Sequence, residues 1–99
     1  RLGLDVTFRP EEIHNEDGYV GEGYGVMTPE CRQAIKLVAQ TEGIILDPVY
    51  SSKAMAGLID HIRRKTISEK ETVVFLHTGG TPALFAYAED LQLEVGEAR

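Results

Sequence analysis

Cysteine and basic residues are scarce in this sequence, and their scarcity argues against several classes of protein. Cys31 is the single cysteine among the 99 residues, so a disulfide framework is excluded and a reducing compartment is favoured. Ten lysines and arginines stand against sixteen aspartates and glutamates, which gives a formal net charge of -6. That charge argues against non-specific nucleic-acid binding, because such binding needs cations that neutralise phosphates.

Long apolar runs and common ligand-binding motifs are also missing. No apolar run approaches the roughly 20 residues that a membrane-spanning helix needs. There is no Walker pattern, no Gly-x-Gly-x-x-Gly after a predicted strand, and no His, Cys and carboxylate spacing typical of a metal site. The basic cluster at residues 61–65 is predicted at the end of a helix, where cations complement the helix dipole. We therefore expect no membrane, nucleic-acid or metal partner.

Two helices are predicted in the middle of the chain. The first begins after Thr28 as N-cap, with Pro29 at its first position, and ends at Gly43. Its apolar stripe consists of Cys31, Ala34, Ile35 and Val38. The second begins at Ser51 and Ser52, one of which is expected to cap it. Its apolar face consists of Met55, Leu58, Ile59 and Ile62.

The clearest strand pattern lies near residue 75. The apolar run 73–76 stops at a threonine and two glycines, and Thr81-Pro82 then begins a third helix that continues to about Leu91. This order predicts a buried strand, a tight turn and a helix N-terminus. In open α/β sheets, ligands lie at the carboxyl ends of strands, where such turns occur. The shorter run 44–46 is a second strand or an extended connection.

The predicted elements make an α/β fold that is incomplete on its own. The strand over 73–76 is apolar at successive positions, as in parallel sheets that are covered on both faces. Two strands and three helices cannot supply that cover, so we expect a piece of a larger fold or association with another chain. Residues 10–27 lack periodicity, and their tyrosines leave open a packed site loop or a flexible tail. Residues 92–99 are expected to be a polar tail.

Three places could carry chemistry on sequence grounds. The amides of residues 78–80 could bind an anion at a helix N-terminus, or could form a plain turn between a strand and a helix. Residues 47–53 present a phenol and hydroxyls near another helix start. Cys31 is expected to be a core thiol rather than half of a thiol–imidazole pair. We expect His77 to be a hydrogen-bonded packing residue rather than a general base.

Four segments together resemble the C-terminal third of the D-cysteine desulfhydrase and 1-aminocyclopropane-1-carboxylate (ACC) deaminase family. They are Gly-Tyr-Gly-Val at 23–26, Thr-Glu-Gly-Ile-Ile-Leu-Asp-Pro-Val-Tyr at 41–50, Lys-Ala-Met-Ala-Gly-Leu-Ile at 53–59 and His-Thr-Gly-Gly-Thr-Pro-Ala-Leu at 77–84. These are pyridoxal 5'-phosphate (PLP) enzymes with the tryptophan synthase β-type fold, known as fold type II. The resemblance extends over about residues 1–90.

The resemblance implies that residues 1–99 are the C-terminal fragment of the PLP-binding large domain of a longer chain. That chain would be a cytoplasmic homodimer. Its Schiff-base lysine, its phosphate loop and a catalytic serine would lie upstream of this segment. Lys53 is not expected to be the Schiff-base lysine, so the segment alone is expected to be inactive.

The resemblance also assigns five site residues. Tyr50 and Tyr24 would be catalytic and face the substrate. Thr78 would reach the pyridine nitrogen of the cofactor, and Gly79 would lie against its ring. Ser51 stands where ACC deaminases carry a glutamate, and Thr78 stands where they carry a leucine.

Ser51 and Thr78 favour one activity of the family over the other. A carboxylate beside the pyridine nitrogen stabilises the protonated ring, which draws electrons strongly enough for opening of a cyclopropane. Hydroxyls leave the ring mostly neutral, which suffices when a thiolate departs. We therefore expect β-elimination of D-cysteine to pyruvate, ammonia and hydrogen sulfide. ACC deaminase is the alternative enzyme, and a non-catalytic fragment or association module is the alternative of another class.

Overall fold

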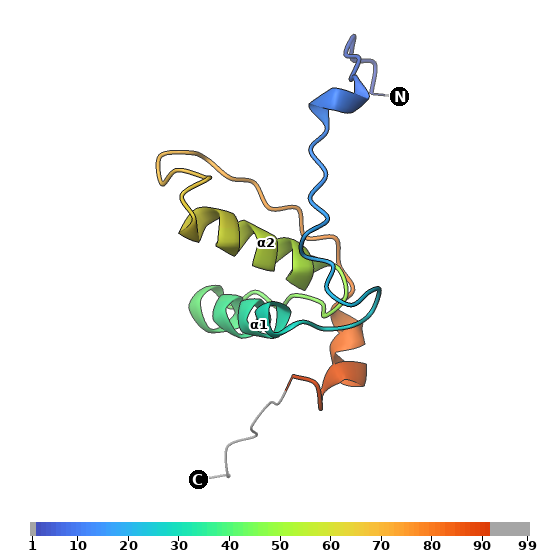
Figure 1. The fold of residues 1–99 in the computed structure, drawn as a ribbon. Coiled ribbons are helices and arrows are strands. Elements are labelled where there is room, and N and C mark those ends of the chain that lie inside the picture. The colour runs from blue at the N-terminus through green and yellow to red at the C-terminus, as the bar shows by residue number, and fades with distance from the viewer. Residues whose placement is uncertain (1, 92–99) are drawn as a thin grey trace.

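Two helices that pack side by side form the centre of the structure. The computed structural model describes residues 2–91 (Figure 1). Helix α1 is Pro29–Glu42 and helix α2 is Ser51–Arg63; they are accompanied by two short 3-10 helices, η1 at Pro10–Glu12 and η2 at Thr81–Tyr87. The N-terminal arm extends away from the helix pair, while η2 lies near one end of α1. The pair of helices is therefore the frame on which the irregular segments are arranged.

Helix α1 forms as its sequence signals predict. The Thr28 hydroxyl accepts the amide hydrogen of Cys31 at 3.2 Å, and Pro29 occupies the first turn. Gly43 ends the helix with a φ of 66°, in the left-handed region that favours glycine. All four residues of the predicted stripe are buried: Cys31, Ala34, Ile35 and Val38. Cys31 is thus a core thiol, as expected.

Helix α2 differs from its prediction in the residues that it buries. Its buried residues are small, namely Ser51, Ser52, Ala56 and Gly57. The predicted face of larger residues is only partly covered, and Ile62 is 45% exposed. Gly57 lies under the ring of Tyr19, where an added Cβ would come within 3.1 Å of the ring. The absence of a side chain at Gly57 therefore lets the irregular segment pack on the helix.

The core joins both helices to segments that lie far away in the sequence. Buried Leu46, from the connection between α1 and α2, packs with buried Leu91 near the end of the described chain. The same cluster holds Ile35 and Val38 of α1. Partly buried residues pack against it from four other places: Met27, Met55, Phe75 and Leu84. The core is small, but it fixes the C-terminal segment against α1.

The predicted parallel sheet is not confirmed, because no strand is found in residues 2–91. Strands exchange hydrogen bonds with neighbouring strands, and residues 73–76 form no such ladder within the described chain. Val74 and Leu76 are 88% and 79% exposed. Residues 44–46 likewise form a connection without regular structure, of which only Leu46 is buried.

The third predicted helix is shorter and more tightly wound than expected. Residues 81–87 form the 3-10 helix η2, and a turn leads from there to Leu91. Leu84 and Leu91 pack on the core, whereas Phe85 is almost fully exposed. Short helices gain most of their stability from packing, and this one is packed on one side only. The predicted polar tail at 92–99 lies outside the described residues.

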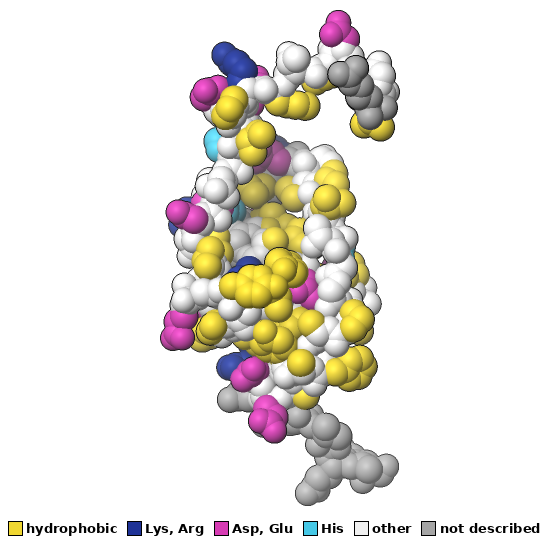
Figure 2. Space-filling model, turned by 90° about the vertical axis from the view of Figure 1, so that its right-hand side faces the viewer, with side chains coloured by type: hydrophobic (Ala, Val, Ile, Leu, Met, Phe, Trp, Pro, Cys, Tyr) yellow, Lys and Arg dark blue, Asp and Glu magenta, His cyan; other side chains and the backbone are white. Residues whose placement is uncertain are grey.

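Exposed hydrophobic side chains are numerous for so small a chain. Figure 2 shows them gathered over much of one face. The exposed large hydrophobic residues of the described chain include Tyr24, Tyr50, Val74, Leu76 and Phe85. Extensive exposed apolar patches usually mark surfaces that contact other protein or a ligand. Among residues 2–91, no helix is long and apolar enough to cross a membrane.

We expect Leu46→Ala to lower the free energy of unfolding by about 2–5 kcal/mol, because it opens a cavity in the core. Leu46→Met conserves volume and should cost less than about 1.5 kcal/mol. Urea denaturation of the 99-residue chain, followed by circular dichroism, measures both losses. Equal losses for the two variants would contradict the placement of Leu46 at the centre of the core.

Candidate active site

A buried carboxylate organises the start of α2. Asp47 is 1% exposed. Its Oδ2 accepts the amide hydrogens of Val49 and Tyr50 at 2.8 and 2.7 Å, and its Oδ1 accepts that of Ser51 at 2.6 Å. These amides have no partner within the helix, so the carboxylate caps α2. The expectation that a serine caps this helix is wrong: Tyr50 is the N-cap residue, and the Asp47 carboxylate accepts the amide hydrogens at the helix start.

Ser51 completes this Asp47 turn (residues 47–51). Its hydroxyl donates to Asp47 Oδ1 and accepts the amide hydrogen of Asp47 at 2.7 Å. Burial alone raises the pKa of the Asp47 carboxyl, but the Ser51 hydroxyl and the amides of Tyr50, Ser51 and Val49 lower it, and the pKa lies below its usual value. The Ser51 proton is therefore held by a charged carboxylate.

The glycine turn (residues 78–80) packs directly on the Asp47 turn. Gly80 has a φ of +89°, and an added Cβ would lie 3.0 Å from both Cβ and Cγ of Asp47. Gly79 has a φ of +90°, and no atom of the described residues lies within 4 Å of the position of an added Cβ. The Thr78 side chain is exposed. The two turns that were singled out in the sequence thus lie together, with Asp47 beneath Gly80.

His77 holds the glycine turn in place. Its Nδ1 accepts the amide hydrogen of Gly79 at 3.0 Å. Its Nε2 lies 2.8 Å from the carbonyl oxygen of Ile45, so the neutral imidazole carries its proton on Nε2 and donates it to that carbonyl. Both ring nitrogens are committed to the backbone. This agrees with the expectation of a hydrogen-bonded packing histidine.

Tyr24 and Tyr50, from segments far apart in the sequence, come together on the surface. Their phenol oxygens lie 2.6 Å apart, and their ring centroids are 5.9 Å apart with an interplanar angle of 62°. The hydrogen bond with Tyr24 is the main cause that raises the pKa of Tyr50, followed by burial and by the negative charges nearby. Both rings are more than half exposed.

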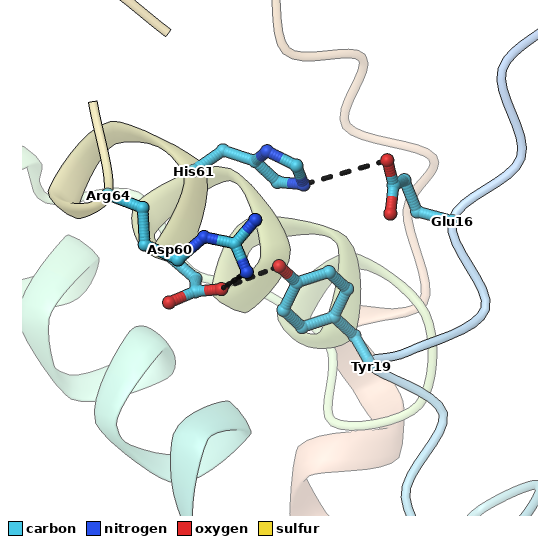
Figure 3. A network of polar contacts seen from close by, with 5 residues as sticks. All are labelled: Glu16, Tyr19, Asp60, His61 and Arg64. Atoms are coloured by element: carbon cyan, nitrogen blue, oxygen red, sulfur yellow. Dashed lines mark hydrogen bonds and ion pairs between the residues drawn. The ribbon is translucent and has the colours of Figure 1, made fainter. Parts of the chain in front are cut away.

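A second polar network lies on the opposite end of α2 (Figure 3). The Tyr19 hydroxyl donates to Asp60 Oδ2 at 2.6 Å, and Arg64 pairs with the same oxygen at 3.5 Å. His61 Nε2 lies 3.7 Å from a carboxylate oxygen of Glu16. These contacts fasten the irregular segment to the helix, so this part of the segment is packed.

Two clefts border Tyr19 rather than the predicted site. One of about 680 Å³ lies between α1 and α2, and one of about 360 Å³ lies on the side of α2 that carries Lys53 and His61. Neither is lined by Tyr24, Tyr50, Ser51, Thr78 or Gly79. Of those five residues, Ser51 is buried, Gly79 is partly exposed, and the other three are exposed.

Sequence reasoning missed Asp47 as the centre of the site. Residues 47–53 were singled out for their phenol and hydroxyls, and the carboxylate of Asp47 was given no role. A signal was present, since Asp shortly before a helix is a preferred capping residue. Ser52, the other candidate cap, has a buried hydroxyl with no hydrogen-bond partner within the described residues.

The fold and these turns belong to a known class of enzymes. The sequence model of the family described as "Pyridoxal-phosphate dependent enzyme" matches residues 2–79. The chain belongs to this family, whose cofactor is PLP.

Within the family, similar proteins include D-cysteine desulfhydrases and an ACC deaminase homologue. D-cysteine desulfhydrases from Salmonella newport (strain SL254) and Salmonella enteritidis PT4 (strain P125109) are each 53% identical to this chain over 87 residues. The match covers 88% of this chain but 26% of each relative, so the chain spans about a quarter of their length. A crystal structure of an ACC deaminase homologue is 45% identical, with a TM-score of 0.63, and the match covers 70% of this chain and 21% of that one.

The packing of Gly80 on Asp47 predicts unequal effects for two adjacent glycines. Alanine at either position is strained by a positive φ, at a cost of about 1–3 kcal/mol. Gly80→Ala must in addition displace Asp47, whereas Gly79→Ala meets open space. We therefore expect Gly80→Ala to lower the free energy of unfolding more than its neighbour does. Urea denaturation of the two variants measures the difference, and equal losses would contradict the contact.

The lowered pKa of Asp47 predicts that stability depends on pH. An unfolded aspartate titrates near a pH of about 3.9, and the folded one titrates lower. The stabilisation is therefore complete above the unfolded pKa and is lost as the pH falls through the folded pKa. Urea denaturation from neutral to acidic pH should show this loss, and Asp47→Asn should reduce it.

The matched variant Asp47→Ala removes the cap as well as the charge. At neutral pH it should cost about 0.5–2 kcal/mol, as capping residues do. An Asp47→Asn protein that keeps the full pH dependence would show that another carboxyl is responsible.

Proposed function

We propose that the protein to which this segment belongs is a PLP-dependent lyase that eliminates sulfide from D-cysteine, leaving pyruvate and ammonia. The observation that carries this proposal is the chemical character of the site. Its exposed groups are the Thr78 hydroxyl and the phenols of Tyr24 and Tyr50. The carboxylate beside them, Asp47, is buried and bonded to the start of α2.

The glycine turn fits the ring end of the cofactor. The space beside Gly79 is open, so a planar ring can lie against the backbone there. Thr78 presents its hydroxyl on the same turn and would hydrogen-bond the ring nitrogen. Ser51 is buried beneath the turn and stays neutral, since its proton is held by Asp47. No full negative charge then reaches the ring nitrogen from these residues.

The phenols of Tyr24 and Tyr50 would transfer protons to the substrate. PLP, when bound, supplies a sink for the negative charge that develops on the substrate. A phenol is protonated at neutral pH, and the hydrogen bond with Tyr24 raises the pKa of Tyr50 further. A protonated phenol can donate to a departing thiolate, and Tyr24 can replace that proton along their shared hydrogen bond. Tyr24 and Tyr50 are the catalytic residues of this proposal.

The rest of the longer protein would complete both the fold and the site. Residues 1–99 would form the C-terminal part of the PLP-binding large domain, within a parallel sheet completed by the rest of the chain. The exposed Val74 and Leu76 support this, because a covered strand would bury them. The Schiff-base lysine and the phosphate loop would lie elsewhere in that chain. A homodimer in the cytoplasm also belongs to this proposal.

ACC deaminase is the second candidate, and its support is the likeness to the ACC deaminase homologue. Against it stand Ser51 and Thr78, which put hydroxyls where that activity would require a carboxylate and a leucine. A non-catalytic association module would use the exposed apolar face as its contact surface.

The test is the product formed by the full-length, PLP-loaded protein. We expect sulfide and pyruvate from D-cysteine, and little 2-oxobutanoate from ACC. Tyr50→Phe removes one hydroxyl and should lower the rate of sulfide release by roughly 10²–10⁴-fold, as loss of a positioned proton donor does. Release of 2-oxobutanoate from ACC without sulfide from D-cysteine would overturn the proposal in favour of the second candidate.

A further inference from the structure

Tyr24 lies on a segment that has no regular structure, yet its phenol meets that of Tyr50 at 2.6 Å. Such a segment has many accessible backbone conformations, and fixing it in one of them costs conformational entropy. Three glycines surround Tyr24, at 21, 23 and 25, and they increase that freedom. Contacts from outside the segment must therefore hold Tyr24 in place.

Two side chains donate hydrogen bonds to the backbone on both sides of Tyr24. The Lys53 ammonium donates to the carbonyl oxygens of Val20 and Gly23 at 2.6 and 2.8 Å. The Tyr87 hydroxyl donates to the carbonyl oxygen of Gly25 at 2.7 Å. Hydrogen bonds from an ammonium are roughly twice as strong as those between neutral groups. The carbonyls just before and just after Tyr24 are thus both held.

The position of Lys53 links these hydrogen bonds to the pair formed by Tyr24 and Tyr50. Lys53 lies in the first turn of α2, and Tyr50 is the N-cap residue of the same helix. The ammonium therefore fixes the segment relative to Tyr50 itself. Tyr87 comes from η2 and ties the same segment to the helix that follows the glycine turn. An added Cβ on Gly25 would lie 3.3 Å from the Tyr87 hydroxyl, so the approach is close.

We propose that Lys53 and Tyr87 are positioning residues that hold Tyr24 in hydrogen-bond contact with Tyr50. Neither is proposed to touch the substrate. Their effect on catalysis rests on the proposed function. Their hydrogen bonds to the segment that carries Tyr24 do not depend on it. Lys53 thereby has a role that its sequence position, at the start of a helix, did not suggest.

The test compares variants of the full-length, PLP-loaded protein. Lys53→Met removes the ammonium and keeps the aliphatic stem, Lys53→Arg keeps a charged donor, and Tyr87→Phe removes one hydroxyl. Lys70→Met is the matched control, because Lys70 is an exposed lysine in the connection that follows α2. Two quantities are measured: the pH at which the phenol pair ionises, and kcat and KM for sulfide release from D-cysteine.

Ionisation of the pair is followed by phenolate absorbance, as the difference between each protein and its Tyr50→Phe counterpart. Lys53→Met should shift this ionisation to lower pH, because the bond with Tyr24 is the main cause that raises the pKa of Tyr50. It should lower kcat roughly 10–100-fold, as expected when a reacting group moves by about 1 Å. KM should change less than kcat. Tyr87→Phe should act in the same direction but more weakly.

Lys53→Arg should restore most of both quantities, and Lys70→Met should change neither. An unshifted ionisation in both Lys53→Met and Tyr87→Phe would overturn the proposal, as would equal effects of Lys53→Met and Lys53→Arg. If the parent protein releases no sulfide from D-cysteine, the proposed function fails. The ionisation measurement then still decides whether Lys53 and Tyr87 hold Tyr24.

Discussion

The Asp47 carboxylate is the interaction on which the rest of the site depends. It is buried, so it must be fully hydrogen-bonded, and three amides and one hydroxyl meet that requirement. The same bonds start α2 at a defined residue. The helix start in turn sets the position of the Tyr50 ring and of Lys53 one turn along. The hydrogen-bonded carboxylate of Asp47 thus determines where the side chains of Tyr50 and Lys53 begin.

The glycine turn depends on the same carboxylate from the other side. Gly80 approaches Asp47 so closely that its missing Cβ is a structural necessity. The turn is also bonded through His77, so Thr78 is presented from a rigid base. Cofactor and substrate sites work when their groups are held before the ligand arrives. Here the holding groups are Asp47, His77 and Lys53, and none of them needs to contact the ligand.

What the sequence predicted well was local. The start, end and buried stripe of α1 follow from Thr28, Pro29 and Gly43, which act on their immediate neighbours. The capping bonds of Asp47 are local too, whereas its contact with Gly80 joins it to a distant segment that no local signal could indicate. Tyr24 and Tyr50 are 26 residues apart, so no spacing rule could pair them, and only the family resemblance placed them in one site. Residues 73–76 have the composition of a covered strand, but burial needs neighbours that residues 2–91 do not provide.

The two bonds of His77 have a consequence for how a sheet could grow here. One imidazole joins the carbonyl of Ile45 to the amide of Gly79, and so it fixes how the two extended segments are aligned. A slip by one residue would turn every side chain of a strand to the opposite face. In the larger sheet that we propose, a strand added here would meet two segments whose alignment a side chain has already set. Its pairing would then be a docking step rather than a search among registers.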